Sequence, residues 1–289
     1  MTDDPTTAFA SHRSLLVGAA YRILGSHVEA EDVAQETWIR WSRVDPDTVD
    51  DARAYLLTIA TRLALNRARQ LAARKERYVG PWLPEPVTTD PRDDGASAAE
   101  LADEVSMAML IVLEALSPLE RAAFVLTDVF GMSSGEVAAA LDRTPAAVRQ
   151  LVHRARSHVQ ARQPREVVDA DRHREVTLRF MEAAGTGDVD GLLSVLAPDV
   201  TLVTDGGGVK RAALRPIHGA EKVARWLLGV LERPDTPDLE ADMRVVNGEL
   251  AIVLSAPDAV DSVMFLTVEA DRITGLHSIR NPEKLTSVR

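Results

Sequence analysis

The sequence predicts a multidomain protein in which all-α modules precede an α+β domain. Its 289 residues exceed the usual size of a single domain, and an apolar content of 46% is enough to bury more than one core. Residues 9–75 carry helical periodicity, and residues 117–159 carry three helix-start signals. The segments after residue 200 read as strands separated by turn signals.

The composition excludes several classes of site. Without cysteine the chain forms neither disulfides nor thiolate metal sites, and its seven histidines lack the close spacing of metal ligands, so we expect no metal and no cofactor. The stretch "MTDDPTTAFASHRS" lacks a basic region followed by an apolar one, and no window approaches the roughly 18 apolar residues of a membrane span. We therefore expect a cytoplasmic protein with no membrane partner.

Two segments of this acidic chain are basic. The net charge is -11, which by itself disfavours a nucleic-acid partner. However, residues 143–165 contain six arginines and no acidic residue. This basic segment is a candidate nucleic-acid surface.

The first module contains two long amphipathic helices. In "SHVEAEDVAQETWIRWSR", Ser26 and Glu29 have the spacing of a capping box. The apolar side of this helix holds Ala30, Ala34, Thr37, Trp38 and Trp41, and the charged side holds Glu29, Asp32, Glu36, Arg40 and Arg43. In "DARAYLLTIATRLALNRARQ", Leu56, Ile59, Ala60 and Leu63 share one side, and a polar stripe holds Tyr55, Thr58, Arg62, Asn66 and Arg69.

A second module has three helix starts in quick succession. They are Ser117 with Pro118 and Glu120, Ser133 with Glu136, and Thr144 with Pro145, with breaks at Gly131 and "LDRT". A short helix, a tight turn and a longer basic helix are the order of a helix-turn-helix.

The last of these helices has the side chains needed to read DNA. Its expected buried side holds Val148, Leu151, Val152, Ala155 and Val159, and its outward side holds Arg149, Gln150, His153, Arg154, Arg156 and Ser157. Arginine and glutamine pair bidentately with guanine and adenine edges in the major groove. A merely solvated face is the alternative, which the lack of compensating acids disfavours.

The C-terminal segment predicts helices followed by antiparallel strands. "HREVTLRFMEAAGTGDVDGLLSVLAPDV" has a helical pattern. The strands are "TLVTDGGG", "DMRVVNGELAIVLSA" and "VDSVMFLTVEADRITGLHSI", with turns at "NGE" and "ADR". This order is typical of an α+β domain.

Several stretches resemble a known family. "AEDVAQETWIRW", "ARAYLLTIATRLALNRAR" and "LSPLERAAFVLTDVFGMSSGEVAAALDRTPAAVRQLVHRAR" resemble sigma regions 2 and 4 of extracytoplasmic-function sigma factors. "WLPEP", "DGGG" and "NPEKL" resemble signatures of a subgroup with a fused C-terminal cone domain of the SnoaL or NTF2-like type, similar to sigma factors of mycobacteria and other actinobacteria. The resemblance implies region 2 at residues 1–79, a linker at 80–105, region 4 at 106–163 and the SnoaL-like domain at 168–289.

The same resemblance implies a function and a set of site residues. The protein would confer promoter specificity on RNA polymerase, docking on the beta-prime clamp coiled coil and the beta flap. The residues for the clamp would be Asp32, Gln35, Glu36 and Arg40. Those for the minus-ten element would be the loop 45–51 with Tyr55, Thr58, Arg62, Asn66 and Arg69. Those for the minus-thirty-five element would be Thr144, Arg149, Gln150, His153, Arg154 and Ser157. The loop "DPDTVDD" departs from a phosphate-binding pattern, because its four aspartates repel phosphates.

The proline-held segment "PWLPEP" has the features of a built-in peptide ligand. Its prolines keep it extended, so that little entropy is lost on binding, and Trp82 and Leu83 supply apolar anchors. We expect it to dock on the C-terminal domain and to regulate activity in cis. The regulatory contacts would be Trp82, Leu83, Pro84, Glu85, Pro86, Asp205, Gly206, Gly207, Gly208, Asn281, Pro282, Glu283, Lys284 and Leu285. The alternative is that Trp82 packs under the region 2 helices.

Other functions stay open at this stage. A monomeric sigma factor without an obligatory anti-sigma protein is the leading hypothesis, and a helix-turn-helix regulator with a ligand-sensing domain is the alternative. A third is an enzyme whose cone pocket holds Asp205, Arg215, His218 and His277, with a histidine as general base. Because no catalytic dyad is marked in "RPIHGAEK" or "ITGLHSIRN", we expect no enzymatic activity.

Overall fold

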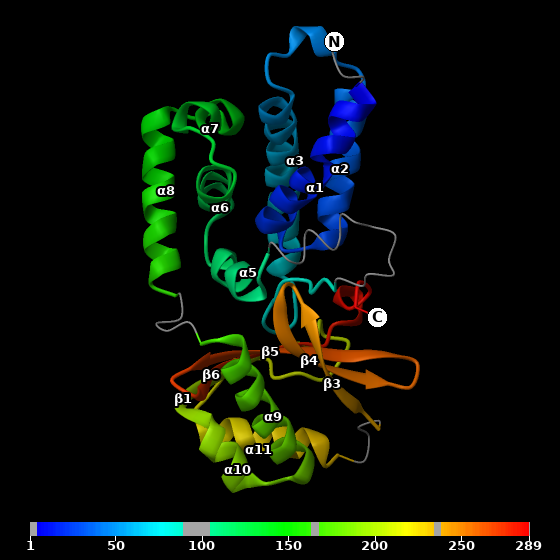
Figure 1. Cartoon of the computed structure of the whole chain (residues 1–289), viewed down its shortest axis with the longest axis vertical. Helices are drawn as coiled ribbons and strands as arrows, with labels where there is room; N and C mark the ends of the chain where they lie inside the picture. The colour runs from blue at the N-terminus through cyan, green and yellow to red at the C-terminus, as the bar shows by residue number, and fades with distance from the viewer. Residues whose placement is uncertain (1–4, 89–104, 163–167, 234–237, 289) are drawn as a thin grey trace. The chain divides into compact units, whose positions relative to one another are not determined.

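The computed structural model describes residues 5–88, 105–162, 168–233 and 238–288 (Figure 1). The chain divides into a helical unit, Met1–Arg77 with Thr89–Gln163, and a C-terminal unit, Tyr78–Thr88 with Pro164–Arg289. Most of the acidic stretch "VTTDPRDDGASAAE" and the expected boundary after residue 163 lie outside the described residues.

The first half of the helical unit is a bundle around α1. Its elements are α1 (Pro5–Leu24), α2 (His27–Trp41), the 3-10 helix η1 (Pro46–Thr48) and α3 (Ala52–Lys75). Residues 16–24 of α1 are all buried, as expected for a helix that α2, α3 and α6 contact on several sides. The Ser26 hydroxyl accepts the Glu29 N–H, which confirms the predicted start of α2.

The second half of the helical unit contains the predicted helix-turn-helix. Its elements are α5 (Met107–Glu114), α6 (Pro118–Phe124), the π-helical turn η2 (Val125–Val129), α7 (Ser134–Leu141) and α8 (Pro145–Gln160). Ser117 and Ser133 form complete capping boxes with Glu120 and Glu136, and the hydroxyl of Thr144 caps α8. All three predicted helix starts are confirmed.

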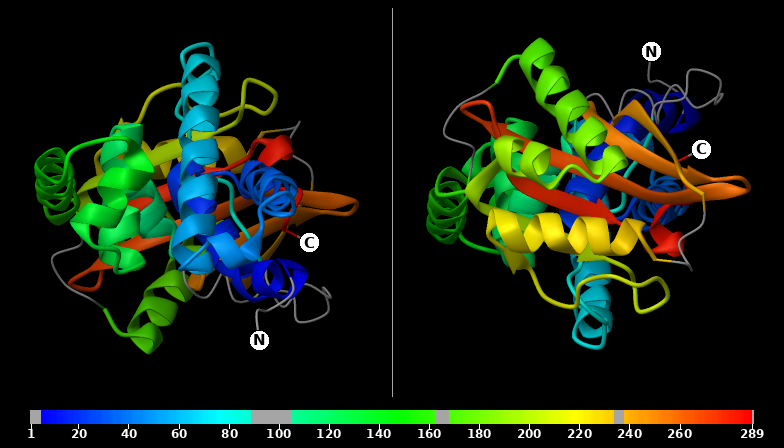
Figure 2. Two further views of the ribbon diagram at one scale, coloured as in Figure 1. Left: turned by 90° about the horizontal axis from the view of Figure 1, so that it is seen from above. Right: turned by 90° about the horizontal axis from the view of Figure 1, so that it is seen from below.

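The C-terminal unit is a six-stranded sheet with helices across one face. Its elements are α9 (Ala170–Thr186), α10 (Val189–Val195), β1 (Leu196–Asp205), β2 (Ile217–His218), α11 (Ala220–Leu231), β3 (Glu240–Val246), β4 (Glu249–Ala256), β5 (Ala259–Glu269), β6 (Arg272–Ile279) and η3 (Pro282–Lys284). The strand order is β2-β1-β6-β5-β4-β3. Figure 2 shows α11, in yellow, lying along the sheet. The predicted multidomain, α then α+β fold class is confirmed.

Two expectations about the C-terminal unit are wrong. The sequence predicts antiparallel strands, but β1 pairs with β6 in parallel. Between these two strands the chain passes through β2, α11 and the antiparallel strands β3 to β5. The residues "LAPDV" were expected to be helical, but they begin β1. The change from helix to strand is not visible in the sequence, because the helical spacing of apolar residues continues up to Val195. The adjacent apolar residues Val195 and Leu196 fit a buried helix and a buried strand equally well.

The turns and the core follow from local chemistry. Asn247, Gly248, Ala270 and Asp271 have positive φ angles, which confirms the turns at "NGE" and "ADR". Alternate side chains of the sheet, such as Leu202, Leu266 and Leu276, face α9, α10 and α11 in one aliphatic core.

Candidate functional site

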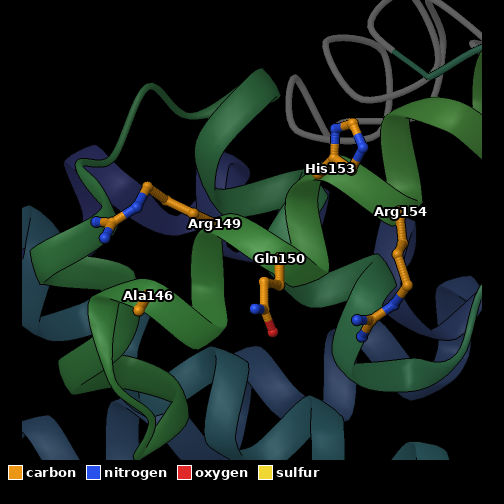
Figure 3. Close-up of a pocket in the computed structure, with 5 residues that line it drawn as sticks. All are labelled: Ala146, Arg149, Gln150, His153 and Arg154. Carbon is orange, nitrogen blue, oxygen red and sulfur yellow. The ribbon is translucent and has the colours of Figure 1, made fainter.

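The outward face of α8 is exposed to solvent. Val148, Leu151, Val152, Ala155 and Val159 are its buried residues, as predicted. Arg149, Gln150, His153 and Arg154 line a shallow hollow with Ala146, and Figure 3 shows Gln150 projecting between the two arginines. We call these five residues the α8 surface. A helix presenting this set of donors and acceptors has the width and the chemistry to enter a major groove.

Two arginines of α8 are held by acidic residues from α6 and η2. The Nε atom of Arg154 donates to Oε1 of Glu120 at 2.7 Å, and the Nε atom of Arg156 donates to Oδ1 of Asp128 at 2.9 Å. The hydrogen bond from Arg154, followed by those from Ser117, lowers the pKa of Glu120. The sequence gives no sign of these pairs, because the acids lie about 30 residues upstream of the arginines.

The predicted polymerase-docking face of α2 is exposed and densely charged. Asp32, Gln35, Glu36 and Arg40 are all exposed. Arg40 donates to Glu36 at 2.6 Å, and Arg67 of α3 lies 3.4 Å from Asp32. The face therefore presents pre-oriented carboxylates with exposed apolar neighbours such as Ile39.

One residue of the polar stripe of α3, Arg62, contacts α7 of the helix-turn-helix. Arg62 donates from Nη2 to the carbonyl of Ala139 at 2.7 Å and from Nε to that of Ala140 at 3.0 Å. These carbonyls belong to the last turn of α7, where no further helical N–H groups are present to donate to them. Arg62 of α3 therefore caps the C-terminus of α7. The rest of the stripe is exposed at Tyr55, Asn66 and Arg69 and half-buried at Thr58.

Further polar contacts join the two halves of the helical unit. Arg121 donates to the carbonyl of Ile23 at 3.0 Å and to Glu114 at 2.8 Å, and Lys75 reaches Glu114 at 2.5 Å. Burial raises the pKa of Glu114, but the charges of Arg121 and Lys75 outweigh it and hold this pKa below its usual value.

The aspartates of the loop 45–51 have structural roles. The carboxylate of Asp45 accepts the N–H of Asp47 and begins η1, and that of Asp51 accepts the N–H of Ala54 and begins α3. Two of the four acids are thus explained as helix caps.

The linker segment lies on the end of the sheet in the C-terminal unit, beside the C-terminal residues drawn in red in Figure 1. Nζ of Lys284 donates to Oδ2 of Asp205 at 2.7 Å and to the carbonyl of Leu83 at 2.5 Å, and it lies 3.3 Å from the centroid of the Trp82 ring. The N–H of Leu83 donates to the same oxygen of Asp205 at 2.8 Å. We call Tyr78, Trp82, Leu83, Asp205, Asn281 and Lys284 the linker site.

The linker site buries a charged pair with compensating partners. The side chain of Asp205 is fully buried and that of Lys284 is 7% exposed. Such a pair is stable only when its hydrogen bonds are satisfied, which Leu83 and Tyr78 achieve here. Burial, followed by the hydrogen bond to Asp205, raises the pKa of Tyr78.

The glycine loop after β1 fits closely around this site. Gly207 has a φ of +65°, and a Cβ atom there would lie 2.5 Å from the side chain of Asn281. Gly208 has a φ of +74°, and its Cβ would lie 3.1 Å from Val79. Side-chain-free positions are therefore required for the linker and the "NPEKL" segment to approach.

Sequence reasoning missed two linker contacts. Tyr78 precedes the recognised motif, yet its hydroxyl joins Asp205 and accepts from Asn281 at 2.8 Å. Asn247 holds Val87 through two hydrogen bonds of 2.9 Å, one through its side chain and one through its backbone. The "NGE" turn was visible in the sequence, but nothing in it indicates that the Asn247 side chain also binds the linker.

The residues considered for a catalytic pocket do not assemble inside the cone. Asp205 is bound to the linker, and the exposed His218 lies 3.0 Å from the hydroxyl of Thr201 on the neighbouring strand. His277 pairs in register with Val203, which puts both on the sheet face opposite the aliphatic core. Burial lowers the pKa of His277 to about 4.

The described residues hold neither a cluster of metal ligands nor a membrane-spanning helix. No group of three or more acidic or histidine side chains suits a metal ion within the described ranges. Among the described helices, none is long and apolar enough to cross a membrane.

Comparison with known proteins decides the family. The models for Sigma-70 region 2, Sigma-70 region 4 and the SnoaL-like domain match residues 8–74, 106–159 and 177–276. The ECF RNA polymerase sigma factor SigJ of Mycobacterium tuberculosis is 39% identical, over 96% of this chain and 92% of that protein. The chain belongs to the ECF RNA polymerase sigma factors. The probable ECF sigma factor SigI of M. tuberculosis is 32% identical over 99% of this sigma factor and 97% of its own length.

The solved structure of SigJ from M. tuberculosis has the same fold. It aligns with 98% of each chain at a TM-score of 0.77 and 35% identity. Region 2, region 4 and the SnoaL-like domain thus occur together in this sigma factor, which acts in promoter recognition with RNA polymerase. A helix-turn-helix regulator is not favoured, because such a protein has no need of region 2.

Proposed function

We propose that this sigma factor uses three surfaces to start transcription. The α2 face of Asp32, Gln35, Glu36 and Arg40 docks on the beta-prime clamp coiled coil, and region 4 contacts the beta flap. The α3 stripe reads the minus-ten element, and the α8 surface with Thr144 and Ser157 reads the minus-thirty-five element. Exposure of the α2 face and of the α8 surface supports these assignments.

The helical unit has to open for both DNA elements to be contacted. The elements are centred about 25 base pairs apart, or roughly 85 Å of duplex at about 3.4 Å per pair. A compact unit of some 150 residues is only about 40 Å across. Because Arg62 bonds the carbonyls of α7, the α3 stripe and the helix-turn-helix are in direct contact, and we infer that polymerase or DNA separates them.

The C-terminal domain regulates activity in cis through the linker site. The observation that supports this proposal most strongly is that Nζ of Lys284 donates hydrogen bonds both to Asp205 and to the Leu83 carbonyl. Only Glu76 and Arg77 separate the end of α3 from Tyr78, so binding of the linker in the C-terminal unit leaves a tether of two residues after α3. In this role the domain is not catalytic, and no separate anti-sigma protein is obligatory. The protein acts in the cytoplasm, as a monomer when free of polymerase.

In vitro transcription tests the surfaces one at a time. Core polymerase with the wild-type protein is expected to give promoter-specific transcripts. Asp32→Lys is expected to abolish co-elution with core polymerase, and Arg149→Glu to abolish dependence on the minus-thirty-five element while co-elution persists. Lys222→Glu, on the exposed face of α11, is the control for charge reversal. If both Asp32→Lys and Arg149→Glu leave transcription unchanged, the assignment of these two surfaces is refuted.

A further inference from the structure

We infer that Glu120 orients Arg154 for bidentate recognition of a guanine in the minus-thirty-five element. The inference deepens the proposed function, since it rests on α8 as the DNA-reading helix. It assigns a positioning role to an α6 residue that lies outside the α8 surface.

One carboxylate of α6 serves two purposes. Oε2 of Glu120 accepts from the hydroxyl of Ser117 at 2.7 Å and from its N–H at 3.2 Å, which closes the capping box of α6. Oε1 accepts from Nε of Arg154 at 2.7 Å. The Glu120 side chain is 12% exposed, so both bonds hold it in one orientation.

The pairing leaves the recognition end of Arg154 outward. The side chain of Arg154 is 53% exposed, and its ion pair with Glu120 uses Nε alone. The two terminal nitrogens carry four of the five N–H groups and form the planar end that matches guanine O6 and N7. Figure 3 shows the Arg154 guanidinium in the same hollow as Gln150, the second candidate reader.

A fixed arginine favours base reading over phosphate binding. The Glu120 carboxylate offsets the charge of Arg154, which weakens attraction to a phosphate. The same carboxylate fixes the guanidinium plane before binding, which reduces the entropy lost when a base is contacted. Arg149 has no such partner in the described residues and is free to adapt to a base or a phosphate.

The Glu120→Gln variant tests this role without removing the helix cap. Glutamine also completes a capping box, so α6 keeps its start while the charge that holds Arg154 is lost. The control is Asp128→Asn, which alters the matching pair with Arg156, an arginine outside the α8 surface. Each variant is assembled with core polymerase, and initiation is measured on promoters with every single-base change in the minus-thirty-five element.

Arg154→Ala is expected to lose about tenfold preference at one guanine, since a bidentate pair contributes 1–3 kcal/mol of discrimination. Glu120→Gln is expected to lose about threefold at the same position, and the double variant no more than Arg154→Ala. Asp128→Asn is expected to keep the wild-type preference. Full discrimination by Glu120→Gln would overturn the inference. So would weaker initiation at all sequences alike with a shallower salt dependence, which indicates a phosphate contact.

The test separates this inference from the proposed function. If Arg149→Ala changes base preference and Glu120→Gln does not, α8 reads DNA but Glu120 has no positioning role. If Arg149→Ala and Arg154→Ala both leave base preference unchanged, the assignment of α8 itself fails. Thermal unfolding and co-elution with core polymerase establish that each variant is folded and assembled.

Discussion

The linker site and the α8 surface both depend on cationic side chains, but at opposite degrees of burial. Lys284 is almost completely buried against Asp205 and Trp82, whereas Arg149 is exposed to solvent. A buried cation has already lost its hydration, so it stabilises the fold only while its partners remain in place. A solvated cation such as Arg149 contributes little to folding and gains interaction energy when a ligand binds. The buried Lys284 is therefore suited to holding the linker, and the exposed Arg149 is suited to recognising DNA.

The largest expected effect is the loss of the buried cation. Lys284→Met keeps most of the apolar side chain but leaves Asp205 buried without its counter-charge, and we expect a loss of about 3 kcal/mol in unfolding free energy. Urea unfolding of the full chain measures it. Lys222→Met, an exposed lysine of α11, is expected to change stability by less than about 0.5 kcal/mol. Equal stability of the two variants would contradict the role of the buried pair.

The glycine loop gives a second test of the same region. Gly207→Ala forces a side chain into a positive φ and against Asn281, so we expect a loss of about 2 kcal/mol. The matched control is Gly185→Ala within α9, where the new Cβ meets nothing within 4 Å and stability is expected to rise by about 0.5 kcal/mol. Thermal unfolding compares them, and a neutral Gly207→Ala would indicate that the loop does not need to fit closely.

The contact of region 2 with region 4 is expected to be weaker. Arg62→Ala removes two hydrogen bonds to α7, one exposed and one partly buried, with an expected loss of about 1 kcal/mol in the stability of the helical unit. Asn66→Ala, one turn further along the same stripe, is the control and is expected to be neutral. Hydrogen exchange of the α7 amides reports the change. No difference in protection between the two variants would argue against the capping role of Arg62.

The last prediction concerns the pH dependence of stability. The unfolded chain protonates His277 near pH 6.5, whereas the folded chain does so only near pH 4, so stability falls as the pH drops through this interval. We expect about 2 kcal/mol less stability at pH 5 than at pH 7 from this group. His277→Gln is expected to flatten that part of the pH profile. An unchanged slope would show that other groups cause the loss.

Local chemistry explains why much of the helical part could be predicted. Ser117, Ser133 and Thr144 cap their helices through hydrogen bonds within three residues, and such signals are complete in the sequence. The buried face of α8 follows from spacing alone. Long-range pairing could not be predicted in this way, because periodicity says which face is buried but not which strand lies beside β1.

The sites were predicted unevenly for the same reason. Exposed reading residues such as Arg149 and Gln150 could be named from one helix. The bonds from Arg154 to Glu120 and from Arg62 to Ala139 join residues 34 and 77 positions apart, and no local pattern indicates them. Asp205 and Lys284 could be named only through a family resemblance, since their pairing depends on the completed sheet.

Promoter-specific transcription by Lys284→Met holoenzyme tests the regulatory claim most directly. Core polymerase is saturated with wild-type or variant protein, and full-length transcripts are counted on one promoter, with Lys222→Met as the control. Release of the linker is predicted to change the transcript yield of Lys284→Met severalfold at equal polymerase occupancy. Equal yields from wild-type and Lys284→Met holoenzymes, with the variant folded and bound, would contradict regulation through the linker site.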